Sequence, residues 1–146
     1  MCGLAGCVSF DSDLTTRPEL AAAMTATMAL RGPDDEGVWT SPHAMLCHRR
    51  LAIIDVAGGR QPMVAHDSPV IVYTGEVYNY RELRQELRAR GHRFRTDSDT
   101  EVVLLSYVEW GPACAERLNG MYAFAIWDSR TEKLVMVRDR MGIKPF

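Results

Sequence analysis

The chain has 146 residues, of which 47% are hydrophobic and 25% are charged, with a formal net charge of −2. This length suits one domain with a buried core, and the near-neutral charge gives no reason to expect nucleic acid or an anionic membrane as a partner. No apolar run reaches the ~18 residues that span a bilayer, so we expect a cytoplasmic protein. The four cysteines form neither a disulfide framework nor a Cys-x-x-Cys metal pair, and we expect reduced thiols and no metal site.

Hydrophobic periodicity, together with glycine and proline positions, divides the chain into strands and helices. In chain order, we expect a strand at 3–10, a helix at 18–30, strands at 38–40, 44–47, 51–56 and 70–73, helices at 79–90 and 98–110, a short helical piece at 115–118, and strands at 122–128 and 133–139. This order is α+β and lacks the regular alternation of a doubly wound parallel sheet.

Two of these helix starts carry capping patterns. Asn79 with Glu82, and Ser98 with Glu101, each place a carboxylate three residues after a residue that caps helices well. Asp99 then lies in the first helical turn, where the helix dipole favours a negative charge. We therefore expect both helices to begin at these residues.

Cys2 directly follows the initiator methionine. Removal of Met1 would leave a thiol and a free α-amine on one residue. The thiol is a strong nucleophile, and an α-amine, which ordinarily titrates near pH ~8, can accept its proton without a histidine. A lone cysteine here is more often an incidental tail residue, so the interpretation depends on the remaining motifs. Of the adjacent Arg49 and Arg50, we expect one to face solvent and the other a site.

Eight segments in a fixed order are diagnostic: MCGLAG, RGPDDEG, HRRLAIID, GGRQPM, TGEVYN, SDTEV, LNGMYAFAIWD and RDRMGIKP. Together they resemble the glutaminase domain of class II glutamine amidotransferases, in particular that of glutamine-hydrolysing asparagine synthetases. The resemblance covers residues 1–146 and implies an N-terminal-nucleophile hydrolase fold, with two antiparallel sheets between helix layers. It also implies that a synthetase domain using ATP and magnesium follows in cis, whereas the glutaminase domain itself needs no cofactor.

The resemblance assigns a nucleophile and a set of substrate contacts. Cys2 would attack the side-chain amide of L-glutamine, release ammonia and form a γ-glutamyl thioester that water cleaves. Arg50 would bind the substrate α-carboxylate, while Glu76 and Asp99 would bind its α-ammonium and polar head. Backbone groups around Ile53 are expected to line the same pocket.

The oxyanion hole departs from the family pattern, in which asparagine and glycine precede the glutamate. Here the pair is Thr74-Gly75, so the Gly75 N–H is retained but the side-chain amide is replaced by a shorter hydroxyl. Losing one such donor typically costs ~3 to 4 kcal/mol of transition-state stabilisation, so we expect weakened glutaminase activity, a repositioned Thr74, or water in its place. Arg31 is assigned a supporting role near the nucleophile. His48 is expected to be structural, because the Cys2 amine makes a histidine base unnecessary.

Three alternatives stay open at this stage. The domain could belong to a glucosamine-phosphate synthase or an amidophosphoribosyltransferase, although SDTEV and LNGMYAFAIWD favour the asparagine synthetase type. β-Lactam synthetases share these segments but usually lack the N-terminal cysteine. A weakly active or non-catalytic module is the third alternative, and retention of Met1 would favour it. The motifs do not specify the final ammonia acceptor, and a homodimer is an open possibility.

Overall fold

The computed structural model describes residues 1–66 and 68–146. Its elements in chain order are β1 (Gly3–Val8), the 3-10 helix η1 (Leu14–Thr16), α1 (Pro18–Thr27), β2 (Asp35–Thr40), β3 (Ala44–Arg50), β4 (Met63–Val64), β5 (Val70–Val77), α2 (Tyr80–Ala89), α3 (Asp99–Trp110), the 3-10 helix η2 (Gly111–Glu116), β6 (Gly120–Asp128) and β7 (Lys133–Arg138).

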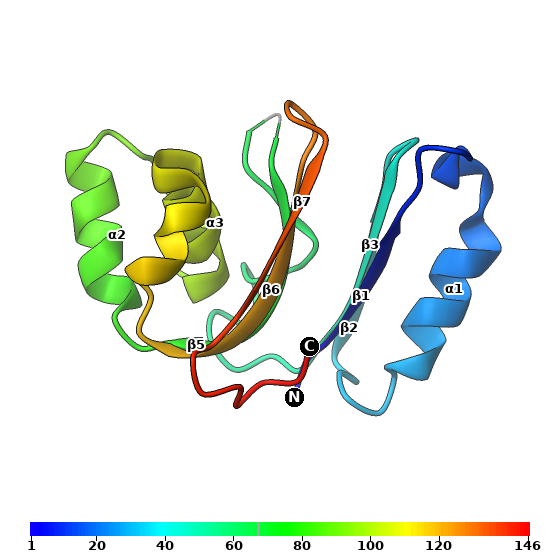
Figure 1. Ribbon diagram of the computed structural model, residues 1–146. Helices are drawn as coiled ribbons and strands as arrows, with labels where there is room; N and C mark the ends of the chain where they lie inside the picture. Colours follow the sequence, from blue (N-terminus) through cyan, green and yellow to red (C-terminus); the bar gives the residue numbers. More distant parts are fainter. Residues whose placement is uncertain (67) are drawn as a thin grey trace.

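The strands form two antiparallel sheets. One has the order β1-β3-β2, and the other has the order β4-β5-β6-β7. Figure 1 shows the sheets facing each other, with α1 outside the first and with α2 and α3 outside the second. The predicted α+β class, with two antiparallel sheets between helix layers, is confirmed. The two chain ends lie close together at one end of the molecule (Figure 1).

Three apolar clusters hold the four layers together. The largest joins α2 and α3 to the second sheet and includes Leu104 and Phe124. A second lies between the sheets around Leu46 and Trp127, and a third joins α1 to the first sheet around Cys47. Fully burying a large apolar side chain contributes about 1.5–3 kcal/mol, so each interface is stabilised by several such residues.

The predicted strand over residues 51–56 is wrong. β3 ends at Arg50, and the chain continues as a loop in which Ile53 and Val56 are exposed. The apolar residues of this segment resemble those of a buried strand, but its backbone carbonyl groups bind a side chain. Its carbonyl groups at positions 54 to 56 accept hydrogen bonds from the Arg50 guanidinium, which a strand would instead direct into a sheet ladder.

Of the two predicted capping boxes, one forms in part and the other does not form. Ser98 caps α3 by accepting a hydrogen bond from a backbone N–H of the first turn. Glu101 does not complete the box, because its carboxylate binds the loop before the helix, including the N–H and hydroxyl of Thr96. Asn79 precedes α2, yet its side chain bonds to the backbone near Asn119 and does not cap the helix. A long-range contact therefore replaces the expected cap at Asn79, whereas Glu101 binds the loop just before its own helix.

Candidate functional site

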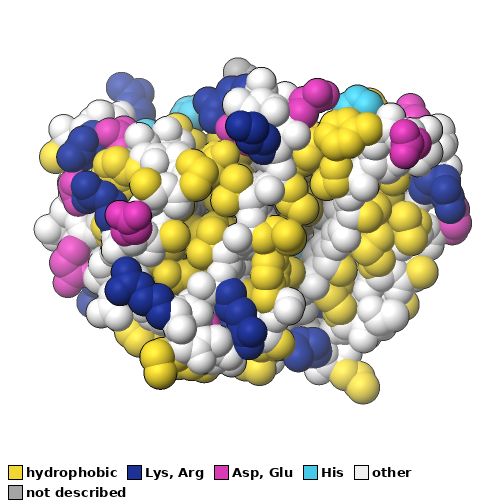
Figure 2. All heavy atoms as spheres, viewed as in Figure 1, with side chains coloured by type: hydrophobic (Ala, Val, Ile, Leu, Met, Phe, Trp, Pro, Cys, Tyr) yellow, Lys and Arg dark blue, Asp and Glu magenta, His cyan; other side chains and the backbone are white. Residues whose placement is uncertain are grey.

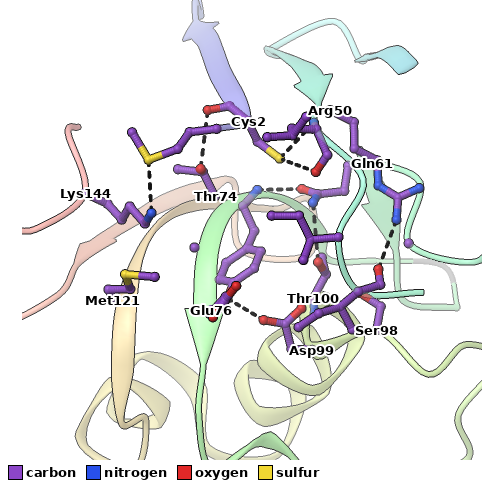
Figure 3. A pocket seen from close by; sticks show the side chains of 17 residues that line it. Cys2, Arg50, Gln61, Thr74, Glu76, Ser98, Asp99, Thr100, Met121 and Lys144 are labelled. Atoms are coloured by element: carbon purple, nitrogen blue, oxygen red, sulfur yellow. Dashed lines mark hydrogen bonds between the residues drawn. The ribbon is translucent and has the colours of Figure 1, made fainter. Parts of the chain in front are cut away.

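The ends of several elements meet at a cavity of about 260 Å³. Cys2 precedes β1 and Arg50 ends β3, and because these strands are antiparallel neighbours both residues lie at the same end of the first sheet. Residues 73–76 of β5 and Asp99 at the start of α3 line the cavity from the second sheet and its helix layer (Figure 3). The cavity is smaller than the roughly 300–1,000 Å³ pockets of drug-sized ligands, so it suits a small molecule.

Cys2 is held at both its sulfur and its carbonyl group. The backbone N–H of Leu51 donates to Sγ at 3.3 Å, and the thiol lies 3.5 Å from the Leu51 carbonyl oxygen. The Cys2 carbonyl oxygen accepts from Arg31 Nε at 3.4 Å and from Thr74 Oγ1 at 3.3 Å. The predicted supporting residue Arg31 thus contacts Cys2 directly, and the Thr74 hydroxyl is directed at the Cys2 backbone (Figure 3).

Arg50 is a buried and firmly held cation. Three of its five N–H bonds point to the carbonyl groups of residues 54–56, at 2.7 to 3.2 Å. Gly59 allows this arrangement, because a Cβ there would lie 2.4 Å from Arg50 Nη2. Within residues 1–66 and 68–146 the remaining N–H bonds have no partner, so they can bind a ligand. Arg49 pairs with Glu36 and does not line the cavity, so of the two adjacent arginines Arg50 is the one that lines it.

Two carboxylates line the same cavity. Asp99 is buried and accepts hydrogen bonds from the Tyr73 hydroxyl at 2.7 Å and from the Val77 N–H at 3.2 Å. Burial nevertheless raises the pKa of Asp99 above its usual value, because these bonds only partly offset the cost of desolvating the charge. Glu76 is half-buried beside it (Figure 3). Ile53 also lines the cavity, although 66% of it is exposed to solvent.

β5 does not end at Tyr73 as predicted but continues through Gly75 and Glu76 to Val77. Gly75 has a φ of 140°, which side-chain-bearing residues rarely adopt. A Cβ at this position would lie 2.1 Å from the Met121 carbonyl oxygen on the neighbouring strand. A glycine is therefore required here, and the backbone of β5 passes directly beside the cavity.

The sequence analysis did not identify Tyr73 and Gln61, whose hydrogen bonds connect β5 to the start of α3 beside the cavity. Tyr73 binds Asp99, and its own N–H donates to Gln61 Oε1 at 2.6 Å. Gln61 Nε2 in turn donates to Thr100 at the start of α3. The Gly58-Gly59 pair before Gln61 signals close backbone packing, but no local signal distinguishes Tyr73 from other aromatic strand residues. Lys144 also lines the cavity without an assigned role.

His48 lies outside this cavity and is fully buried in β3. Its Nε2 bonds to the Tyr73 carbonyl oxygen at 3.0 Å. Burial is the main reason that the pKa of His48 is lowered to about 4, so the ring is neutral near pH 7. Its buried position and neutral charge agree with a structural role. Within residues 1–66 and 68–146, its ring has a hydrogen bond to Tyr73 and none to Cys2.

The structure gives two further observations on ligands and membranes. Within residues 1–66 and 68–146, no group of three or more His, Cys, Asp or Glu side chains could hold a metal ion. In the same part of the chain, no helix is long and apolar enough to cross a bilayer.

A second hollow, of about 560 Å³, is lined by residues such as Leu46 and Met136. Figure 2 shows apolar side chains gathered between the two sheets.

A family described as the glutamine amidotransferase domain matches residues 1–146. The chain belongs to this family. Asparagine synthetase (glutamine-hydrolyzing) 3 of Bacillus subtilis is 49% identical over 149 aligned residues, which are 100% of this chain and 24% of that protein. Asparagine synthetase B (glutamine-hydrolyzing) of Escherichia coli is 38% identical and covers 99% of this chain and 26% of its own length. The glutamine amidotransferase chain thus spans about a quarter of the length of these relatives.

A solved structure supports the fold assignment. The glutamine phosphoribosylpyrophosphate amidotransferase of B. subtilis, in complex with ADP and GMP, superposes with a TM-score of 0.59 at 24% identity, covering 73% of this chain and 25% of that one. The predicted membership of the amidotransferase family and its N-terminal-nucleophile fold are confirmed. The identities with the asparagine synthetases agree with the type that the motifs favour.

Proposed function

We propose that this domain hydrolyses L-glutamine to glutamate and ammonia through a thioester at Cys2. The observation that carries the proposal is that one small cavity brings together the Cys2 thiol, the Arg50 guanidinium and the Asp99 carboxylate. A free amino acid carries both an α-carboxylate and an α-ammonium, so a specific site needs a fixed cation and a fixed anion. Membership of the glutamine amidotransferase family supports the same substrate.

Each charged group has a partner on the substrate. Arg50 binds the α-carboxylate with the N–H bonds that the 54–56 loop does not use. Asp99 and Glu76 bind the α-ammonium and polar head, while Ile53 and its neighbours cover one wall. With its charged head bound in this way, the side-chain amide extends towards Cys2.

The chemistry begins when Met1 has been removed. The Cys2 amine takes the thiol proton, Sγ bonds to the amide carbon, and the carbonyl electron pair moves to oxygen. The Gly75 N–H stabilises this oxyanion. When the pair returns, the C–N bond breaks and the amine gives its proton to the leaving nitrogen, which departs as ammonia. Water then cleaves the thioester to glutamate. With Met1 retained, the same nitrogen is an amide without a basic lone pair, so the cycle cannot start.

We propose that this domain is part of a longer protein that also contains a synthetase domain. In that protein, the ammonia supplies ATP-dependent synthesis of asparagine from aspartate. Relatives named glutamine-hydrolyzing asparagine synthetases support this, because this chain matches only about a quarter of each. ATP and magnesium would then bind outside residues 1–146, and the glutaminase step itself uses only this chain's own groups. The longer protein, supplied with aspartate, ATP, magnesium and glutamine labelled in its amide nitrogen, should transfer that label to asparagine.

The glutaminase step is tested by intact mass and glutamate release on the wild type, Cys2→Ala and Cys7→Ala. Cys7 is a matched control, because it lies on the adjoining β1 strand but does not line the cavity. We expect chains without Met1 to release glutamate, Cys7→Ala to behave as the wild type, and Cys2→Ala to be inactive. Glutamate release that survives Cys2→Ala would refute the mechanism.

A further inference from the structure

Lys144 places a second cation in the cavity. Only 7% of the residue is exposed, and its ammonium contacts the thioether sulfur of Met1 at 3.1 Å. Within residues 1–66 and 68–146, no carboxylate lies within ion-pair distance of this ammonium. Burying an ammonium without an anionic partner is costly. The site therefore has an unmatched positive charge aimed into the cavity that contains Cys2.

A rigid turn delivers this side chain. The Asp139 carboxylate accepts the N–H groups of Ile143 at 2.8 Å and of Lys144 at 3.0 Å. Burial acts to raise the pKa of Asp139, but these two bonds, together with those from the backbone of Tyr122 and Met141, outweigh it and lower that pKa. The Arg138 guanidinium donates to the carbonyl groups of Gly142 and Lys144. Because both backbone groups of Lys144 are bonded, the turn fixes where its side chain enters the cavity.

The ammonium lies in the cavity against Met1, the residue bonded to Cys2. Figure 3 shows Lys144 beside Thr74 and Met121, on the side of Cys2 that faces away from Arg50. The α-carboxylate of glutamine is already assigned to Arg50, so Lys144 is free for another charge. Met1 is bonded to Cys2 and its side chain covers the ammonium. Removal of Met1 takes away the group that covers the ammonium in the cavity that Cys2 also lines.

We propose that Lys144 is a catalytic residue of the glutaminase reaction, whose ammonium stabilises the negative charge on the Cys2 sulfur and on the amide oxygen under attack. This rests on the proposed glutaminase function. The Cys2 amine, and not Lys144, carries the transferred proton. A fixed cation directed at developing charge is most effective in a site that excludes water. The role is needed here because the Thr74 hydroxyl is bonded to the Cys2 carbonyl oxygen and Thr74 offers no side-chain amide.

The test compares Lys144→Met, Lys144→Arg and the control Lys133→Met in chains whose loss of Met1 is verified by intact mass. Methionine keeps the length of the side chain without its charge, and Lys133 is exposed on β7. Two quantities are measured: kcat and KM for glutamine, and the rate at which iodoacetamide alkylates Cys2. We expect Lys144→Met to lower kcat at least about tenfold with KM within about twofold, and to slow alkylation. Lys144→Arg should retain most of both rates, and Lys133→Met should match the wild type.

Wild-type kcat and alkylation in Lys144→Met would overturn the proposal. So would a raised KM with unchanged kcat and alkylation, because the ammonium would then bind the substrate head. If Lys144→Met does not fold, judged by urea unfolding, the same outcomes apply to Lys144→Gln. Alkylation requires no turnover, so it tests Lys144 even if glutamate release proves independent of Cys2 and the proposed function fails.

Discussion

Acidification should destabilise the fold through His48. The ring is fully buried, and its Nε2 must carry the proton because the Tyr73 carbonyl oxygen can only accept. Burial lowers the pKa of His48 from 6.5 to about 4, outweighing the bond to Tyr73. A second proton would have to be placed on Nδ1, which has no partner within residues 1–66 and 68–146. The folded state therefore resists protonation over a range in which the unfolded chain accepts a proton.

The magnitude follows from the difference between the two pKa values. Because the folded pKa is the lower one, the contribution to stability is complete above pH 6.5 and is lost as the pH falls towards about 4. At about 1.4 kcal/mol per unit, the loss from His48 amounts to about 3 kcal/mol in all. Such a loss is a large fraction of the roughly 5–15 kcal/mol that stabilises a typical domain.

Urea unfolding at about pH 7 and about pH 5 measures this effect in the wild type, His48→Gln and His66→Asn. Glutamine can keep the bond to the Tyr73 carbonyl oxygen but has no ionisable ring. His66 is exposed and has a φ of 46°, a conformation that asparagine tolerates. We expect acidification from about pH 7 to about pH 5 to lower the free energy of unfolding less in His48→Gln than in the wild type or His66→Asn. Equal pH dependence in all three would refute the reasoning.

Two further predictions concern the cavity. Thr74→Asn supplies the side-chain amide that the family resemblance leads us to expect at the oxyanion, and should raise kcat for glutamine at least about tenfold. An unchanged kcat would mean that the hydroxyl or a water already serves there. Tyr73→Phe removes a hydrogen bond that favours the Asp99 carboxylate, so the pKa of Asp99 should rise further and the acid limb of kcat/KM should move to higher pH. An acid limb that stays in place would contradict the assignment of Asp99 to the substrate ammonium.

Local patterns predicted most of the fold because most of its elements are locally specified. The strands at 122–128 and 133–139 were expected from their apolar, β-branched and aromatic residues, and β6 and β7 occupy nearly the same positions. The prediction of a strand at 51–56 was wrong because apolar content alone does not distinguish a buried strand from a loop. What makes it a loop is Arg50, whose guanidinium requires three carbonyl groups that a sheet would otherwise use.

The lining of the cavity was predictable only where chemistry and motif coincide. Cys2, Arg50 and Asp99 could be named because a nucleophile, a cation and an anion appear in recognisable segments. The contact of Tyr73 with Asp99 joins residues 26 positions apart, and that of Lys144 with Met1 joins residues 143 positions apart. Neither pair leaves a periodic or turn signal. Such contacts follow from sheet order and from the proximity of the chain ends (Figure 1), which no local pattern contains.

The two cations of the cavity differ in a way that suits different tasks. Three backbone carbonyl groups hold the Arg50 guanidinium in one plane, so it can bind a carboxylate that is present throughout the reaction. The Lys144 ammonium contacts only a neutral thioether, and its charge is not matched by an anion in residues 1–66 and 68–146. An unmatched charge is costly in the resting site but gains most when negative charge appears on the reacting atoms. Arg50 therefore suits the lasting charge of the substrate head, whereas Lys144 suits charge that develops during the reaction.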